Sequence, residues 1–214
     1  ALIGLDSPLI AIHLLWVNLI TDSLPAVALG ADKKPDDIMD DKPRDPKESL
    51  FSHGGYAITF GYGLVIGLIT LAAFLLKPIM AGNYTLADIS SYLNYIDPVT
   101  NKPLQLEEAQ SMAFCVLAMS ELFHMLGMTN TKKSFINVFK DKNVLLWIAF
   151  FLGMGLQFAV IEIPGVNDIF KVYRLSDEPM DYLYVFVLAL MPLVVHEITV
   201  FVLFIKKHLQ KNRA

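Results

Sequence analysis

The chain has 214 residues, of which 55% are hydrophobic and 18% are charged, and its formal net charge is −4. An ordinary soluble domain carries roughly a quarter charged residues, and the net negative charge argues against a nucleic-acid partner, which needs a basic face. The sequence contains one cysteine, Cys115, which excludes an intrachain disulfide and a cysteine zinc site.

Five long apolar segments alternate with short charged patches along the chain. Each segment has about 20 to 24 residues, enough for a helix to cross about 30 Å of hydrocarbon at 1.5 Å per residue. The segments are residues 9–30, 54–76, 109–129, 144–163 and 182–205. We therefore predict an all-α membrane protein in which residues 1–214 form a single transmembrane domain with five transmembrane helices.

The distribution of basic residues predicts the orientation in the membrane. Thirteen of the 17 Lys and Arg residues lie in residues 31–53, in residues 130–143 and in the C-terminal tail. The other four are Lys77, Lys102, Lys171 and Arg174. Because Lys and Arg accumulate in cytoplasmic loops, the two basic loops and the C-terminus are predicted to be cytoplasmic. Residues 77–108 and 164–181 are then external loops, and the N-terminus is outside.

An external N-terminus is unusual for a chain without an export signal. The sequence begins with Ala1 and has no basic segment before its first apolar run. Removal of upstream transmembrane helices would account for both features. We therefore interpret the chain as a truncated fragment of a larger protein.

The first apolar segment carries polar residues at its centre, where an ionisable side chain marks a functional site by default. Asn18, Thr21 and Asp22 are spaced i, i+3 and i+4, and this spacing places them on one helical face. Pro25 has no N–H to donate to the carbonyl of Thr21. A carboxylate, an amide, a hydroxyl and a freed carbonyl form the mixed oxygen set that Ca²⁺ prefers. This favours a metal site over the alternative, a proline kink whose polar residues are satisfied by neighbouring helices.

The third apolar segment carries a second carboxylate, Glu121, near its centre. On a helix that faces the first segment, Glu121 would be a further metal ligand. The alternative is a protonated, hydrogen-bonded carboxyl with a structural role. His124, three residues on, is interpreted as a packed helix residue, because neutral imidazole suits softer metals than Ca²⁺.

Several stretches resemble one known family. LLWVNLITDSLPAVALG (residues 14–30) resembles the sixth transmembrane helix of P-type ATPases of the sarco/endoplasmic reticulum calcium-pump type, including bacterial relatives. DIMDDKPRDPKESLF (residues 37–51) is similar to the cytoplasmic loop that follows in that family, and AMSELFH (residues 118–124) to its eighth helix. The last segment, with Pro192 and Glu197, resembles the tenth.

The resemblance implies a role for each candidate residue. Asn18, Thr21 and Asp22 match the sixth-helix calcium ligands, with Asp22 bridging two sites where both exist, and Glu121 matches the eighth-helix ligand. The family's other ligands lie on its fourth and fifth helices. Its phosphorylated aspartate and its nucleotide-binding domain, which use ATP and Mg²⁺, lie upstream. Ser23 stands where the family usually has glycine.

The resemblance also implies partners and a location. The missing N-terminal half of the same polypeptide and the lipid bilayer are the expected partners, and a bacterial relative would reside in the plasma membrane. No catalytic or cofactor-binding residue is expected within this chain, which alone should be inactive.

The chain departs from the family pattern at a second position, His13, where glutamine is common in the family.

The function expected from these observations is the ion-binding and translocation part of an ATP-driven pump that exports Ca²⁺ from the cytosol. One alternative is a passive cation channel or secondary transporter that uses the same carboxylates. Another is a non-transporting membrane subunit. The long match around Asp22 and the inferred truncation favour the pump.

Overall fold

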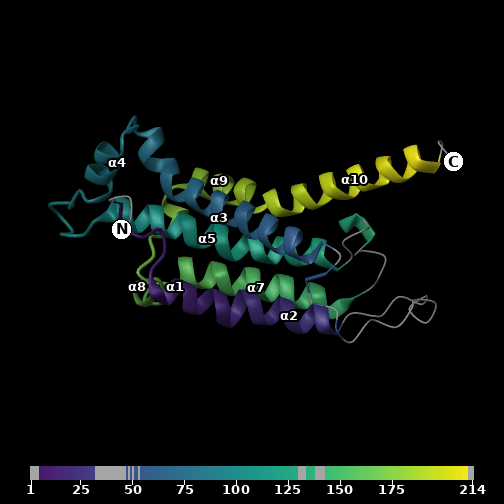
Figure 1. The fold of residues 1–214 in the computed structure, drawn as a ribbon. Helices are drawn as coiled ribbons and strands as arrows, with labels where there is room; N and C mark the ends of the chain where they lie inside the picture. The colour runs from purple at the N-terminus through teal and green to yellow at the C-terminus, as the bar shows by residue number, and fades with distance from the viewer. Residues whose placement is uncertain are drawn as a thin grey trace.

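The computed structural model describes residues 5–31, 47, 49, 51–52, 54–129, 134–137 and 143–211. Within these residues every regular element is a helix (Figure 1). Five helical stretches are long and apolar enough to cross a membrane, namely Ala11–Gly30, Gly55–Met80, Leu104–Met128, Val144–Glu162 and Pro179–Lys206. The all-α class and the five candidate spans are therefore confirmed, whereas the orientation of the termini stays a prediction.

Two of the five spans consist of more than one helix. The first contains α1 (Ala11–Trp16), the π-helix η1 (Val17–Asp22) and α2 (Ser23–Gly30), and the last contains α9 (Pro179–Ala189) and α10 (Met191–Lys211). The other three spans are α3 (Gly55–Met80), α5 (Leu104–Met128) and α7 (Val144–Glu162). Short helices lie in the connections: α4 (Leu86–Leu93), α8 (Val166–Phe170) and the 3₁₀ turns η3 (Phe135–Asn137) and η4 (Leu175–Asp177).

Helix α5 is the centre of the bundle. In its most apolar window 78% of the residues are buried, against 17% to 39% in the other four spans. It packs against α3, α9 and α10 on one side and against α7, η1 and α2 on the other (Figure 1). A helix that is covered all round is a core helix, so polar side chains on α5 face other helices rather than lipid.

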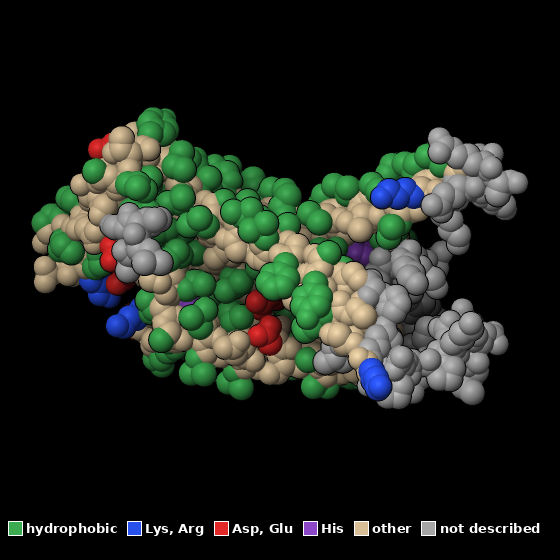
Figure 2. Space-filling model, in the orientation of Figure 1, with side chains coloured by type: hydrophobic (Ala, Val, Ile, Leu, Met, Phe, Trp, Pro, Cys, Tyr) green, Lys and Arg blue, Asp and Glu red, His purple; other side chains and the backbone are tan. Residues whose placement is uncertain are grey.

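The outer surface of the bundle is apolar. Hydrophobic side chains cover most of the face seen in Figure 2, and large residues such as Phe60, Leu64 and Phe151 are exposed. An apolar surface of this extent marks an interaction or membrane surface. Lipid tails are the solvent that suits it, because each helix satisfies its own backbone hydrogen bonds.

The last span is divided at Leu190. Pro192 has no N–H for the carbonyl of Leu188, and this loss ends α9 and begins α10. Figure 1 shows α10 running on from α9 towards the C-terminus. Helix α10 approaches α5 closely, since a Cβ added at Gly127 would lie 2.9 Å from Cγ of His196.

The bundle has two ends that differ in their connections. Helices α4 and α8 and the described start of the chain lie at one end, here called the α4 end (Figure 1). The end of α10 lies at the opposite end. The first span therefore enters at the α4 end, and η1 lies about midway along it.

Candidate functional site

The π-helix η1 carries three of the four residues that the sequence predicts as metal ligands: Asn18, Thr21 and Asp22. A π turn contains one more residue than an α turn and is often found at functional sites. The helix continues past Pro25 as α2, which begins at Ser23 after the wider turn. The freed carbonyl of Thr21 stays a prediction.

The three residues of η1 differ in their surroundings. Thr21 is buried, with 1% of its surface exposed, whereas Asn18 and Asp22 are exposed. The hydroxyl of Ser23 donates to the carbonyl of Asn18 at 3.1 Å. The wide turn thus directs Thr21 into the bundle and leaves the carboxylate of Asp22 accessible.

Glu121 of α5 lies directly against η1. Oε2 of Glu121 is 2.6 Å from Oγ1 of Thr21, which is also 3.1 Å from the carbonyl of Val17. The hydroxyl has a single hydrogen and donates to one of these acceptors at a time. The charge of Asp22 also interacts with that of Glu121. The structure therefore brings together Thr21, Glu121 and Asp22 from two helices that are far apart in the sequence.

The site offers oxygen atoms of the kinds that hard cations bind. The carboxylates of Asp22 and Glu121 and the hydroxyl of Thr21 supply part of the six to eight oxygens that Ca²⁺ takes. Figure 2 shows acidic side chains about midway along an otherwise apolar surface. Among the described residues the side chain of Asn18 makes no hydrogen bond, so its amide oxygen is available at this exposed position.

Comparisons with known proteins identify the family of the chain. The model of the family described as "Cation transporting ATPase, C-terminus" matches residues 6–202. The chain belongs to this family. The site described above lies inside the matched residues.

Three curated relatives of this chain are named as calcium-transporting ATPases, one of them as a probable one. This chain is 39% identical over 197 residues to calcium-transporting ATPase 1 of Bacillus cereus, and the aligned residues make up 92% of this chain and 21% of the relative. It is 31% identical to the calcium-transporting ATPase of Bacillus subtilis, covering 89% of this chain and 19% of the relative. A probable calcium-transporting ATPase of Trypanosoma brucei brucei is 29% identical, covering 83% and 18% respectively. The chain spans about a fifth of the length of these relatives.

Polar contacts that the sequence did not reveal hold α1 in place beside the site. The indole Nε1 of Trp16 donates to Oε1 of Gln157 at 2.9 Å, and Gln157 is fully buried. His13 is also fully buried, with Nε2 2.9 Å from the carbonyl of Phe170 and its ring stacked on Phe114. A lone glutamine at bilayer depth was the available signal for this contact, because a polar side chain in lipid needs a partner.

His124 and Ser120, the other polar residues near Glu121 on α5, have contacts of their own. His124 packs against Tyr62 with 4.2 Å between ring centroids, which agrees with the interpretation of a packed helix residue. The hydroxyl of Ser120 donates to the carbonyl of Leu117 at 2.8 Å within α5. Neither side chain is hydrogen-bonded to Glu121 in the described structure, so Thr21 is its partner.

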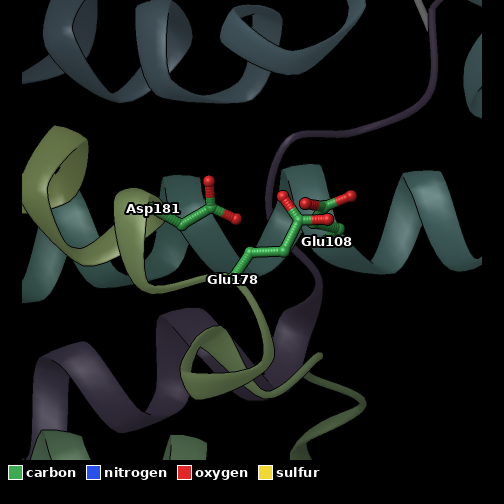
Figure 3. Close-up of side chains that lie close together, drawn as sticks. All are labelled: Glu108, Glu178 and Asp181. Atoms are coloured by element: carbon green, nitrogen blue, oxygen red, sulfur yellow. The ribbon is translucent and has the colours of Figure 1, made fainter.

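A second group of acidic side chains lies at the α4 end, where Glu108, Glu178 and Asp181 converge (Figure 3). Nζ of Lys77 contacts all three, at 2.7 Å from Oε1 of Glu108 and 2.8 Å from Oδ1 of Asp181, and by an ion pair with Glu178. Sequence reasoning missed this group, here called the Lys77 cluster, because its four members come from three separate segments.

Proposed function

We propose that the chain is the ion-binding membrane part of an ATP-driven pump that exports Ca²⁺ from the cytosol. The observation that carries the proposal is the 2.6 Å contact between Thr21 and Glu121. It places a second carboxylate beside η1, where Asp22 provides the first. Membership of the cation-transporting ATPase family and the names of the curated relatives support Ca²⁺ as the transported ion.

The geometry gives each residue a task. Oε2 of Glu121 is held by Thr21, so Oε1 remains free to bind the ion. Asp22 is exposed and can bind an ion that arrives from the open side of η1. When the ion leaves, two carboxylates at bilayer depth repel each other, and a proton on one of them relieves the repulsion. Protons would thus replace Ca²⁺ in the empty site.

The proposal requires partners outside this chain. Two carboxylates, one amide and one hydroxyl do not complete a Ca²⁺ coordination shell of six to eight oxygens. The remaining ligands would come from other transmembrane helices of the same polypeptide, which would also carry the domains that use ATP and Mg²⁺. The relatives are about five times longer than this chain, which leaves room for both.

The orientation and location complete the proposal. The basic loops, the C-terminus and the opposite end of the bundle would face the cytoplasm, and the α4 end would face outwards. In a bacterium the membrane would be the plasma membrane. Ca²⁺ would reach η1 from the cytoplasmic side and leave towards the α4 end.

The test is ATP-dependent Ca²⁺ uptake by inside-out vesicles that contain the full-length protein. Asp22→Asn should abolish uptake, because it removes one carboxylate while conserving the size of the side chain. Asp88→Asn is a matched control, since Asp88 is exposed on α4 and far from η1 in the chain. Near-normal uptake by Asp22→Asn would overturn the site. Uptake that proceeds without ATP along a Ca²⁺ gradient would instead indicate a channel or a secondary transporter.

A further inference from the structure

The end of α3 and the turn into α4 present an exposed surface without charge. Between Lys77 and Asp88 the sequence PIMAGNYTLA (residues 78–87) contains no charged side chain. Figure 1 shows the last turns of α3 diverging from the bundle beside α4. Four large side chains of this stretch are exposed, and they are here called the α3–α4 corner: Ile79 at 42%, Met80 at 59%, Tyr84 at 78% and Leu86 at 55%.

The corner is fixed from the inside of the bundle. Ile89 and Leu93 of α4 are 5% and 0% exposed, and they belong to one core cluster with Phe74 of α3. The hydroxyl of Thr85 accepts a hydrogen bond from the N–H of Asp88 at 3.1 Å and so caps α4. The corner is therefore a defined part of the fold, and its side chains project from two packed helices.

The turn between α3 and α4 makes backbone hydrogen bonds of its own. The N–H of Ala81 donates to the carbonyl of Lys77 at 2.9 Å. Both the backbone N–H and the side-chain amide of Asn83 donate to the carbonyl of Pro78, at 3.1 Å and 3.2 Å. Unpaired backbone groups are costly next to lipid. A turn that pairs its own groups in this way suits the surface of a bilayer.

The cation that precedes the corner points away from it. The side chain of Lys77 is 13% exposed, and its Nζ lies 2.7 Å from Oε1 of Glu108 and 2.8 Å from Oδ1 of Asp181. A lysine near the end of a span commonly extends its ammonium towards the lipid headgroups. Here the ammonium is held inside the bundle by the Lys77 cluster. The outer side of the end of α3 is thereby left apolar.

The corner continues the apolar outer face of α3. Leu64 and Leu68 are exposed on that face, and residues 55–76 contain no charged side chain. Ile79 follows Leu68 after about three helical turns and therefore lies on the same face. Figure 2 shows hydrophobic side chains along this edge of the molecule. The surface that lipid covers on α3 thus runs into the corner without an intervening charge.

The length of α3 brings the corner to the level of the headgroups. Its 26 residues extend about 39 Å, which is about 9 Å more than the hydrocarbon core of a bilayer. Tyrosine is enriched at this level, and apolar side chains of surface-bound segments insert there. We propose that the α3–α4 corner binds the lipid surface at the α4 end, with its aliphatic side chains between acyl chains and the phenol of Tyr84 among the headgroups.

A second exposed apolar residue of the same connection has different surroundings and provides the control. Val99 is 89% exposed, and it lies in a turn in which Asp97 accepts hydrogen bonds from the N–H of Val99 and the hydroxyl of Thr100. Lys102 follows three residues later. Charged neighbours on both sides place Val99 in water. The uncharged stretch and its continuity with α3 therefore distinguish the corner, and exposure alone does not.

The experiment is spin labelling of the full-length protein in phosphatidylcholine vesicles. A nitroxide is attached to Tyr84→Cys or Leu86→Cys, and to Val99→Cys as the matched control. Cys115 is buried, which shields its thiol from the label. The parent protein without an added cysteine is labelled alongside, and its signal is subtracted. ATP-dependent Ca²⁺ uptake verifies that each variant is folded. The readout is the rate of nitroxide collisions with O₂, which concentrates among acyl chains, relative to collisions with a water-soluble nickel chelate.

The expected result is a reversal between the corner and the control. Labels at Tyr84→Cys and Leu86→Cys should collide more often with O₂ than with the chelate, and the label at Val99→Cys should show the opposite order. Replacing part of the phosphatidylcholine by anionic phosphatidylglycerol should leave the corner ratios unchanged, because the corner has no charge. Either corner variant is sufficient for the test if the other does not fold.

Three outcomes would overturn the proposal. One is chelate accessibility at the corner equal to that at Val99→Cys, which would place the corner in water. Another is low accessibility to both reagents, which would show that protein covers the corner, either another part of the polypeptide or a second copy. The third is preferential collision with O₂ only when anionic lipid is present, which would replace apolar insertion by attraction between charges.

Discussion

The hydrogen bond between Thr21 and Glu121 permits a sharp test of the calcium site. Thr21→Val keeps the shape of the buried side chain and removes its hydroxyl, so Oε2 of Glu121 loses the partner that lies 2.6 Å away. Hydrogen bonds to charged groups contribute about 1.5–3 kcal/mol. Because each 1.4 kcal/mol corresponds to about a tenfold change in affinity, the variant should bind Ca²⁺ about 10- to 100-fold more weakly.

The direction of this change follows from the geometry. A carboxylate has acceptor positions on both oxygens, so Thr21 can hold Oε2 while the ion binds Oε1. The hydrogen bond then persists in the ion-bound state and is strongest when the carboxylate is ionised. Removing it weakens the bound state more than an empty state in which the site is protonated.

The assay is the Ca²⁺ concentration that gives half-maximal ATP-dependent uptake in vesicles. Thr21→Ser is the matched control, because it keeps the hydroxyl and should remain close to the wild type. A Thr21→Val protein with wild-type Ca²⁺ dependence would refute the reasoning, since Thr21 would then neither bind the ion nor orient Glu121. A loss of Ca²⁺ affinity in Thr21→Ser but not in Thr21→Val would point to packing of the methyl group instead, because valine keeps that methyl and serine lacks it.

Two further predictions concern the helices that surround the site. Gly127→Ala should lower the free energy of unfolding in detergent by about 1–3 kcal/mol, because the added Cβ would lie 2.9 Å from Cγ of His196. Gly155→Ala is the matched control, because a Cβ added there has open space. It should leave the free energy of unfolding unchanged or raise it by up to about 1 kcal/mol. Equal stability of the two variants would exclude a tight contact between α5 and α10. Gln157→Leu should cost about 1–3 kcal/mol by leaving the indole N–H of Trp16 without an acceptor. The double variant with Trp16→Phe should recover part of that loss, and a double variant with no recovery would show that the hydrogen bond is not what the single variant removes.

The sequence was sufficient for the class of fold, and its choice of metal ligands stays a prediction, although the structure places Thr21 and Glu121 in contact. Apolar segments of about 20 residues predict spans because lipid leaves a helix few alternatives. Asp22 and Glu121 stood out because ionisable groups are costly at that depth. The pairing of Glu121 with Thr21 rather than with Asn18 was not predictable, since it depends on the π turn that rotates Thr21 towards α5.

Other features depend on contacts between segments that no local pattern marks. Lys77 and Glu108 lie in the segment that the sequence presents as one charged external loop, and Asp181 lies some 70 residues beyond Glu108. Only the packing of α3, α5 and α9 brings them together. Gln157 likewise accepts a hydrogen bond from Trp16 only because α1 and α7 are adjacent in the fold. Spacing rules describe one helix at a time and cannot supply such pairs.

The first span combines fixed ends with an adaptable centre, and this arrangement suits a site that must bind and release an ion. Trp16 and His13 hold α1 to Gln157 and to the carbonyl of Phe170, and α2 packs against α7. Between these anchors η1 contains the extra residue of a π turn. A change between i→i+5 and i→i+4 hydrogen bonds would rotate Asn18 relative to Asp22 while both anchored ends stay in place. Rearrangement of the ligands is thereby confined to six residues, beside a carboxylate that the central helix α5 holds still.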